Sequence, residues 1–194
     1  MFFLRSLFSR TPKLTASEIL KKISLFAELE AVTPHTKAAI LLSPDDREFF
    51  RDFRNTVIRL MDQIKNPPQF KLGSDDHGTK WIILEKAPFR DLVTAIDDIS
   101  AAIWVQETGD RIIAAIFKGT FEKEESYWIC NYRTARFYPF IPEKKPESNE
   151  DDSMAPASRG RNHEKEITLG QLFRSSGLPV ETPENWFALW DAPF

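Results

Sequence analysis

The residues best suited to acid–base or metal chemistry lie in one short polar stretch, Asp75-Asp76-His77. Two carboxylates beside an imidazole can bind a metal ion or exchange protons with a substrate. The glycine and serine around them are typical of a turn, and this composition favours a polar hairpin tip. The other two histidines, His35 and His163, fall in predicted turn and disordered segments. Because no further ligands are indicated, we expect no metal site.

Two other candidates for catalysis have simpler structural explanations. Asp97 and Asp98 are adjacent carboxylates, but neighbouring positions on a helix do not face each other, so they do not form a catalytic dyad. Cys130 is the single cysteine and lies in an apolar run, which predicts a buried structural thiol rather than a nucleophile. A lone cysteine cannot form an intrachain disulfide, and this indicates a reducing compartment such as the cytosol.

The sequence motifs of the common enzyme classes are missing. The chain contains no Walker loop and no GxGxxG, HExxH or GxSxG pattern, and its 7 glycines argue against a glycine-rich phosphate loop. We therefore expect no catalytic residues, no cofactor and no enzymatic activity. One alternative stays open: a hydrolase whose site is assembled from scattered residues such as Asp76, His77 and Arg136, provided that the fold brings them into one pocket.

Cations and aromatic rings alternate over residues 133–140, RTARFYPF. Such a stretch can stack single-stranded RNA bases on a sheet, here with Tyr132, Arg136 and Tyr138. The net charge of −3 and the pI near 5.7 argue against a nucleic-acid partner, because binding to phosphates relies on lysine and arginine. Alternation across a strand, with aromatic side chains inward and arginines outward, explains the pattern more simply.

Aromatic residues are unusually frequent, with 16 Phe, 5 Trp and 3 Tyr. They are numerous enough to fill a core and still supply a binding surface. Trp186 and Trp190 are four positions apart, so on a helix they would share one face and either fill the core or anchor an interface. We take Trp186, Trp190, Arg136 and Tyr138 as candidates for binding a protein partner.

Residues 1–13 form a short segment with the pattern of an amphipathic helix. Arg5 and Arg10 supply positive charge, and the apolar run is too short and too interrupted for a signal peptide or a membrane helix. The segment could lie in a membrane interface or pack on its own domain, since about ten residues bury too little surface to anchor a protein alone. The candidate membrane-contact residues are Phe2, Phe3, Leu4, Leu7 and Phe8.

Residues 14–194 are expected to form one α+β domain. Helical spacing predicts helices at 16–30, 45–65, 88–103 and 166–174. Apolar runs predict strands at 37–42, 69–72, 81–84, 112–117 and 127–138, the last as one long strand or a bent pair. Strands in consecutive blocks favour an antiparallel sheet packed against helices. Residues 143–163 contain few apolar side chains and are predicted to be a disordered insertion.

Several blocks along the chain resemble the PspA-associated protein PspAB family. They occur in order as KWIILE (80–85), FRDLVTAI (89–96), IAAIF (113–117), RFYPFIP (136–142), LPVE (178–181) and WFALWDAP (186–193). The apolar opening, with Leu4, Leu7 and Arg10, is similar to the start of that family as well. The resemblance covers most of residues 70–194 apart from the predicted insertion, and it is weaker over residues 11–69.

The resemblance implies a bacterial or archaeal protein of the phage-shock type of envelope stress response, with genes that neighbour those for PspA or the membrane metalloprotease HtpX. It implies no reaction and no catalytic residues. The order of elements is also similar to the type III secretion chaperone-like fold, which presents a peptide-binding face. We therefore expect a non-enzymatic cytoplasmic adaptor or chaperone-like protein that binds PspA or an HtpX-type protease, either free or peripheral at the inner face of the membrane.

Overall fold

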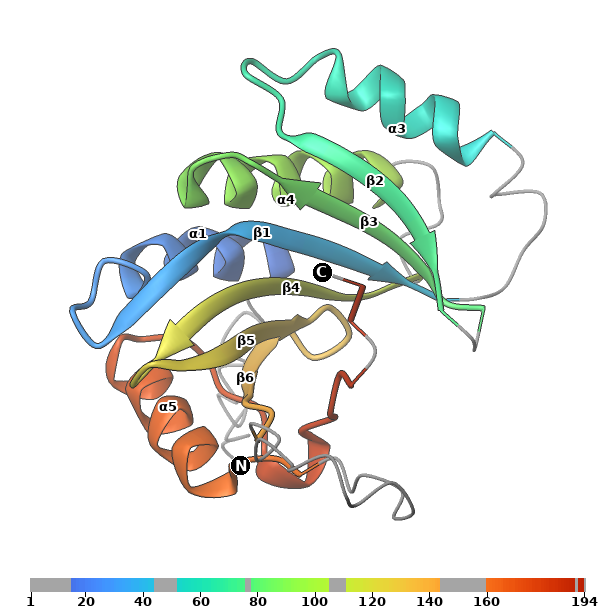
Figure 1. Ribbon diagram of the computed structural model, residues 1–194. Helices are drawn as coiled ribbons and strands as arrows, with labels where there is room; N and C mark the ends of the chain where they lie inside the picture. The colour runs from blue at the N-terminus through green and yellow to red at the C-terminus, as the bar shows by residue number, and fades with distance from the viewer. Residues whose placement is uncertain are drawn as a thin grey trace, which may run out of the picture.

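The computed structural model describes residues 15–43, 52–75, 78–104, 111–143, 160–190 and 192–193. In chain order the elements are α1 (Ala16–Phe26), β1 (Val32–Leu42), α3 (Phe53–Met61), β2 (Gln69–Ser74), β3 (Lys80–Glu85), α4 (Phe89–Ile103), β4 (Ile112–Phe121), β5 (Glu124–Asn131), β6 (Arg136–Phe140), α5 (His163–Ser175) and a short 3-10 helix (Pro183–Asn185). The strands form one six-stranded sheet, ordered β2-β3-β1-β4-β5-β6, with every neighbouring pair antiparallel (Figure 1). The predicted α+β class is therefore confirmed.

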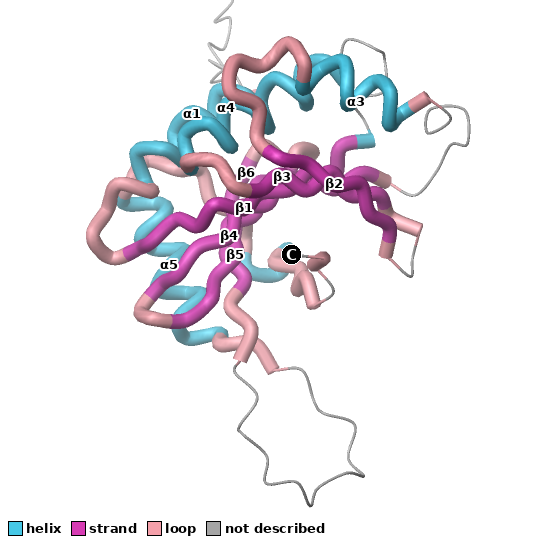
Figure 2. The backbone as a smooth tube through the Cα atoms, turned by 45° about the horizontal axis from the view of Figure 1, so that its top comes forward, coloured by secondary structure: helices cyan, strands magenta, loops and turns pink. Residues whose placement is uncertain are grey.

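Helices α1, α4 and α5 pack on one face of the curved sheet, and the C-terminal segment lies on the opposite face (Figure 2). On the helix-bearing face, Phe117 pairs with Trp128 across β4 and β5. There Phe26 of α1 meets Trp128 edge-on at 4.9 Å, and Phe173 of α5 meets Phe26 at 4.7 Å between ring centroids. These rings join two helices and the centre of the sheet into one core.

Glycine at position 119 makes room for the largest of these rings. Trp128 is fully buried, and a Cβ added at Gly119 would stand 2.5 Å from Cζ2 of its indole. Any larger residue at this point of β4 would collide with the indole, because interiors are packed too densely to absorb such an overlap. The close approach explains a glycine inside a strand, where it otherwise weakens the structure.

Two tight turns connect the last three strands. Glu122 and Lys123 have positive φ values of 48° and 67°, as a two-residue hairpin between β4 and β5 requires. Ala135 has a φ of 53° in the turn between β5 and β6. The stretch predicted at 127–138 is therefore the bent pair rather than one long strand.

Several predicted boundaries differ from the observed ones. Helix α1 ends at Phe26 rather than at residue 30. Strand β1 starts at Val32, five residues earlier than predicted, and passes through Pro34 at a register shift, where a missing backbone N–H is tolerated. Within the predicted helix at 45–65, the structure describes α3 from Phe53 to Met61, and residues 44–51 lie outside the described part.

The domain holds both ends of the predicted insertion at 143–163. Glu143 N donates to Gly160 O at 2.8 Å, and Pro142 pairs with Arg161 in an isolated bridge. Asn162 then caps α5 by accepting a hydrogen bond from the Lys165 N–H. Residues 160–163 therefore belong to the fold and are not part of a disordered insertion. Residues 144–159 lie outside the described part of the chain.

Residues 179–181 cover the outer edge of β6. Phe137 N donates to Pro179 O and Glu181 N donates to Phe137 O, both at 2.8 Å. This short parallel pairing satisfies backbone groups that an open sheet edge would expose. From here the chain continues to the face of the sheet opposite the helices (Figure 2).

Candidate functional site

Within Asp75-Asp76-His77 the structure describes Asp75, and the side chain of this residue stabilises a turn. The Asp75 carboxylate accepts hydrogen bonds from the Thr79 N–H at 2.9 Å and from Trp81 Nε1 at 3.2 Å. Asp76 and His77 lie outside the described residues, so their proposed meeting with Arg136 stays untested. Over the ranges that are described, no three His, Cys, Asp or Glu side chains are grouped as metal ligands would be.

The other two catalytic candidates have the surroundings that the sequence predicted. Asp97 is half-buried and Asp98 is exposed, so the adjacent carboxylates differ in environment and do not form a dyad. Cys130 has no exposed surface, and burial raises the pKa of its thiol far above the ordinary value. A thiol held in this protonated form is a poor nucleophile.

The three residues considered for RNA stacking differ in exposure and in the face from which they project. Tyr138 is 5% exposed, and burial raises the pKa of its hydroxyl. Tyr132 projects from the opposite face, where its hydroxyl contacts α4. Arg136 is exposed and its Nη1 donates to Val180 O at 3.0 Å. The three residues of the RNA-binding alternative therefore share no open face in the described structure.

The two C-terminal tryptophans do not share a helix. The short 3-10 helix ends at Asn185, and Trp186 has extended backbone angles. Trp186 is 7% exposed and its Nε1 donates to Glu181 O at 3.0 Å, so it belongs to the core, as one alternative allowed. Trp190 is half-buried and meets Phe140 edge-on at 4.9 Å. The aromatic C-terminus thus packs on its own sheet, leaving Phe187 exposed.

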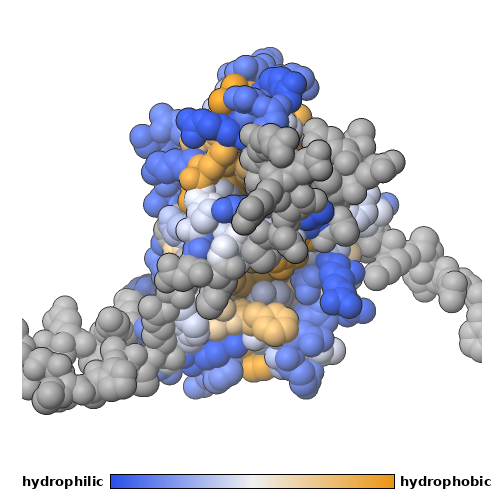
Figure 3. Space-filling model, turned by 90° about the vertical axis from the view of Figure 1, so that its right-hand side faces the viewer, coloured by the Kyte–Doolittle hydropathy of each residue, from blue (hydrophilic) through white to orange (hydrophobic). Residues whose placement is uncertain are grey.

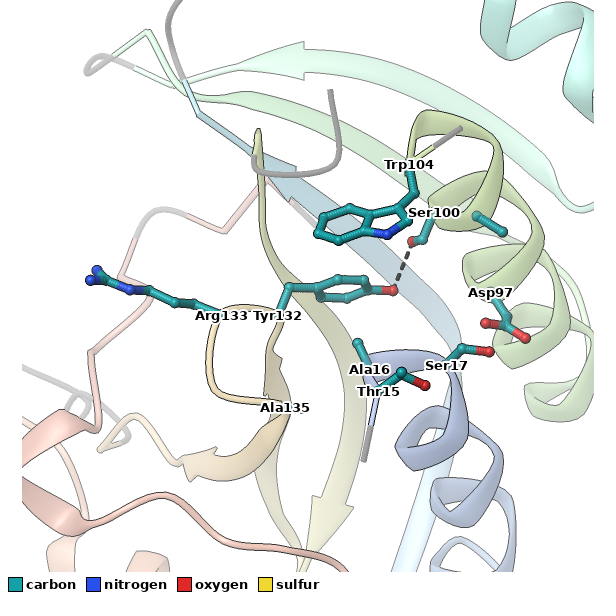
Figure 4. Close-up of a pocket in the computed structure, with 10 residues that line it drawn as sticks. Thr15, Ala16, Ser17, Asp97, Ser100, Trp104, Tyr132, Arg133 and Ala135 are labelled. Atoms are coloured by element: carbon teal, nitrogen blue, oxygen red, sulfur yellow. Dashed lines mark hydrogen bonds between the residues drawn. The ribbon is translucent and has the colours of Figure 1, made fainter. Parts of the chain in front are cut away.

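A cavity of about 440 Å³ opens on the helix-bearing face (Figure 4). It lies between the start of α1 (residues 15–17), the second half of α4 and the turn after β5 (residues 132–135). Its lining is mostly apolar, and its size falls within the range of about 300–1,000 Å³ that is typical of ligand pockets. In the described structure, this cavity combines an open apolar space with exposed aromatic surface.

The aromatic part of the cavity is built by Trp104 and Tyr132. The Tyr132 hydroxyl donates to Ser100 Oγ at 2.7 Å, which fixes the phenol ring against α4. Burial raises the pKa of Tyr132, so the ring stays neutral and cannot act as a base near neutral pH. Trp104, at the end of α4, extends over the same space with 62% of its surface exposed (Figure 4).

Among the described residues that line the cavity, the charged ones lie at its margins. The Asp97 carboxylate is 19% exposed, and Lys21 Nζ is 3.9 Å from it, at the limit of an ion pair. Arg133 points away from the cavity (Figure 4). The site can therefore bind an apolar group beside a cation, and it contains no described pair of groups arranged for proton transfer or nucleophilic attack.

The comparison with protein families identifies the family of this chain. The family model described as PspA associated protein B matches residues 20–194. The chain belongs to the PspAB family. Its description names an association with PspA and no reaction. No curated protein and no solved structure matches the chain, so similarity to the secretion-chaperone fold is not confirmed.

The PspAB match includes most of the cavity. Asp97, Trp104 and Tyr132 lie within the matched range, whereas residues 15–17 and the N-terminal segment precede that range. Among the described residues, none of the helices has the length and apolar character to cross a bilayer. The predicted membrane-contact residues Phe2, Phe3, Leu4, Leu7 and Phe8 lie outside the described part.

Trp104 is the site residue that the sequence analysis missed. The buried stripe of α4 contains Leu92, Ile96, Ile99 and Ile103, and Trp104 follows this stripe by one position. One step along a helix turns a side chain by about 100°, so Trp104 points away from the core. A large aromatic residue beside such a stripe is the signal that could have identified it.

Proposed function

We propose that this PspAB-family chain is a non-enzymatic cytoplasmic adaptor or chaperone-like protein of the PspA-type envelope stress response. It binds PspA or an HtpX-type membrane protease, and its N-terminal segment brings it to the membrane surface. The family description, which names association with PspA, supports the first of these partners. The observation that carries the proposal is the exposed indole of Trp104 over an apolar cavity.

Trp104 has the properties of an interface anchor. Tryptophan and tyrosine are enriched among the residues that dominate binding energy, and Tyr132 lies in the same cavity. An indole that is 62% exposed adds little to folding but offers a large apolar surface to a partner. Ile113, whose carbonyl accepts the Tyr132 N–H, is another large apolar residue with an exposed side chain, at 41%.

The four partner-binding candidates from the sequence have two roles in this proposal. Arg136 and Trp190 retain accessible surface and can contact a partner directly. Trp186 and Tyr138 are buried, so they act by positioning the C-terminal segment and β6. The C-terminal region would then be a second contact, on the face opposite the cavity (Figure 2).

A pull-down from the native host with the full chain tests the proposal. We expect PspA, an HtpX-type protease, or both to be enriched with the wild-type chain, and Trp104→Ala to reduce the recovery about tenfold, as for a hot-spot residue. Ile167→Ala is the matched control, because Ile167 is also exposed, at 43%, but lies on α5. If the Trp104→Ala and wild-type chains recover the partner equally, the cavity is not the binding surface. If the wild-type chain recovers neither PspA nor an HtpX-type protease, the proposal is overturned.

Membrane contact is tested separately by co-sedimentation with anionic liposomes. The variant carries Phe3→Ser and Phe8→Ser in the full chain, and Ser6→Ala serves as the control. We expect the wild-type chain and the control to sediment and the double variant to remain in the supernatant, because the segment loses two of its five apolar membrane-contact candidates. No sedimentation of the wild-type chain would contradict the membrane part.

A further inference from the structure

The cavity opens at the point where the N-terminal segment joins the domain. Thr15, Ala16 and Ser17 form one of its walls (Figure 4). Residues 1–14, which lie outside the described part, are therefore bonded directly to the cavity wall. The predicted amphipathic segment is therefore joined through the backbone to a residue that lines the apolar cavity.

The tether between them is short. The seven residue steps from Phe8 to Thr15 span at most about 25 Å when the chain is fully extended. A group held on such a tether has an effective concentration in the millimolar range at its site, so even weak binding would be largely saturated within one chain. The segment therefore has an advantage over any free peptide of similar sequence.

The segment and the cavity are also complementary in chemistry. The segment carries three phenylalanines among its first eight residues, with Arg5 and Arg10 as cations. The cavity offers the apolar surface of Trp104 and Tyr132, with the Asp97 carboxylate at its margin. Lys21 is the described cation near Asp97, but it is 71% exposed and 3.9 Å away, which leaves room for a closer cation.

We propose that this cavity is the docking site of the chain's own N-terminal segment, with Phe8 as the apolar anchor and an arginine facing Asp97. This inference goes beyond partner binding, because it makes one surface common to two events. The two events are docking of the segment and binding of a partner at Trp104.

Disulfide trapping in the full chain tests the docking. The variant carries Ser9→Cys, which leaves the apolar residues intact, and Ala101→Cys on the exposed side of α4 at the cavity. The control pairs Ser9→Cys with Thr168→Cys on the exposed surface of α5. Cys130 is fully buried and does not compete. We expect the Ser9–Ala101 pair to form an intramolecular disulfide about tenfold faster than the control pair.

A second variant separates docking from proximity along the tether. Adding Phe8→Ser to the Ser9→Cys and Ala101→Cys pair should reduce the trapping rate about tenfold if the phenyl ring binds in the cavity. An unchanged rate would show that the tether alone brings the thiols together and would overturn the proposal, as would a rate equal to the control or a disulfide between two chains. The partner pull-down is a separate measurement, of recovered PspA or HtpX-type protease rather than of an intramolecular disulfide, so failure of docking and failure of the adaptor role are distinguishable.

Discussion

The indole of Trp186 lies so close to Gly170 that a Cβ added to the glycine would stand 2.8 Å from Cη2 of the ring. The ring cannot turn away freely, because its Nε1 donates to Glu181 O at 3.0 Å. Through this contact α5 holds the start of the C-terminal segment in place. Trp186 is therefore needed by the fold itself, whatever a partner contacts nearby.

Gly170→Ala is expected to lower the free energy of unfolding by about 1–3 kcal/mol, the usual cost of overpacking a core. Alanine favours a helix by about 1 kcal/mol over glycine, so a net loss would show that the contact with Trp186 outweighs the helix propensity. Urea unfolding of the wild-type and variant chains measures the difference. Gly73→Ala is the control, since its nearest neighbours would be 3.8 Å from the new Cβ. A neutral or stabilising Gly170→Ala would refute the tight contact.

Glu166 is the buried charge that joins α5 to the chain after β6. Its side chain has no exposed surface, accepts the Ile141 N–H at 2.9 Å and pairs with Arg161 Nε at 2.9 Å. Glu166→Gln leaves Arg161 without its counter-charge, so we expect a loss of about 3–5 kcal/mol in urea unfolding. Glu164→Gln, an exposed change two positions earlier, should alter stability by less than about 0.5 kcal/mol. Similar effects of the two changes would contradict a structural role for the buried pair.

Glu85 should make stability depend on pH in the acid range. Its carboxylate pairs with Lys71 at 2.7 Å and with Lys37 at 3.5 Å, linking β3 to both neighbouring strands. The hydrogen bond from Lys71 lowers the pKa of Glu85 below 4.5, although burial opposes the shift. The stabilisation is therefore present above pH 4.5 and is lost as the pH falls through the lower folded-state pKa.

The measurement is the free energy of unfolding of wild-type and Glu85→Gln chains between neutral and acid pH. The difference between the two chains should be largest near neutral pH and shrink as the pH falls below 4.5. Glu30→Gln, on an exposed turn, controls for the loss of one negative charge. A difference that stays constant over this range would show that the pairs with Lys71 and Lys37 contribute no linked stability.

The core could be predicted from the sequence because its signals are local. The stripe of α4 from Leu92 to Ile103 and the run Trp81-Ile82-Ile83-Leu84 have the periodicities of the elements they form. Glu166 could not be identified in the same way, because its burial depends on Arg161 and Ile141, which reach it only in the folded chain. Residues 160–163 were assigned to the insertion for a related reason. Their composition is polar, and the contacts that hold them form only in the folded chain.

The candidate site was harder to predict than the core. The cavity combines the ends of α1 and α4 with the turn after β5, and no sequence spacing reports that these three meet. The prediction for Trp186 and Trp190 assumed helical geometry, whereas the chain there is extended and turns under the sheet. The exposure of Trp104 depends on what α4 packs against. The periodicity of the sequence indicates which side of the helix is buried, but not which elements lie beside the other side.

Trp104 and Tyr132 are expected to differ in what they contribute. Trp104→Ala should change the free energy of unfolding by less than about 0.5 kcal/mol, because the ring is 62% exposed. Tyr132→Phe should cost about 0.5–1.5 kcal/mol, because it removes the hydrogen bond to Ser100. Thermal or urea unfolding distinguishes them. A large loss with Trp104→Ala would mean that the indole serves the fold and would weaken its assignment to binding.

We propose that the Trp104 cavity is the surface through which this PspAB chain meets PspA. The most direct measurement is the dissociation constant of the purified full chain and purified PspA, without membranes, by titration calorimetry. We predict a saturable complex with a dissociation constant of about 1–10 μM or tighter that weakens about tenfold in Trp104→Ala and is unchanged in Ile167→Ala. No binding at about 100 μM, or equal affinity of Trp104→Ala and the wild-type chain, would contradict it.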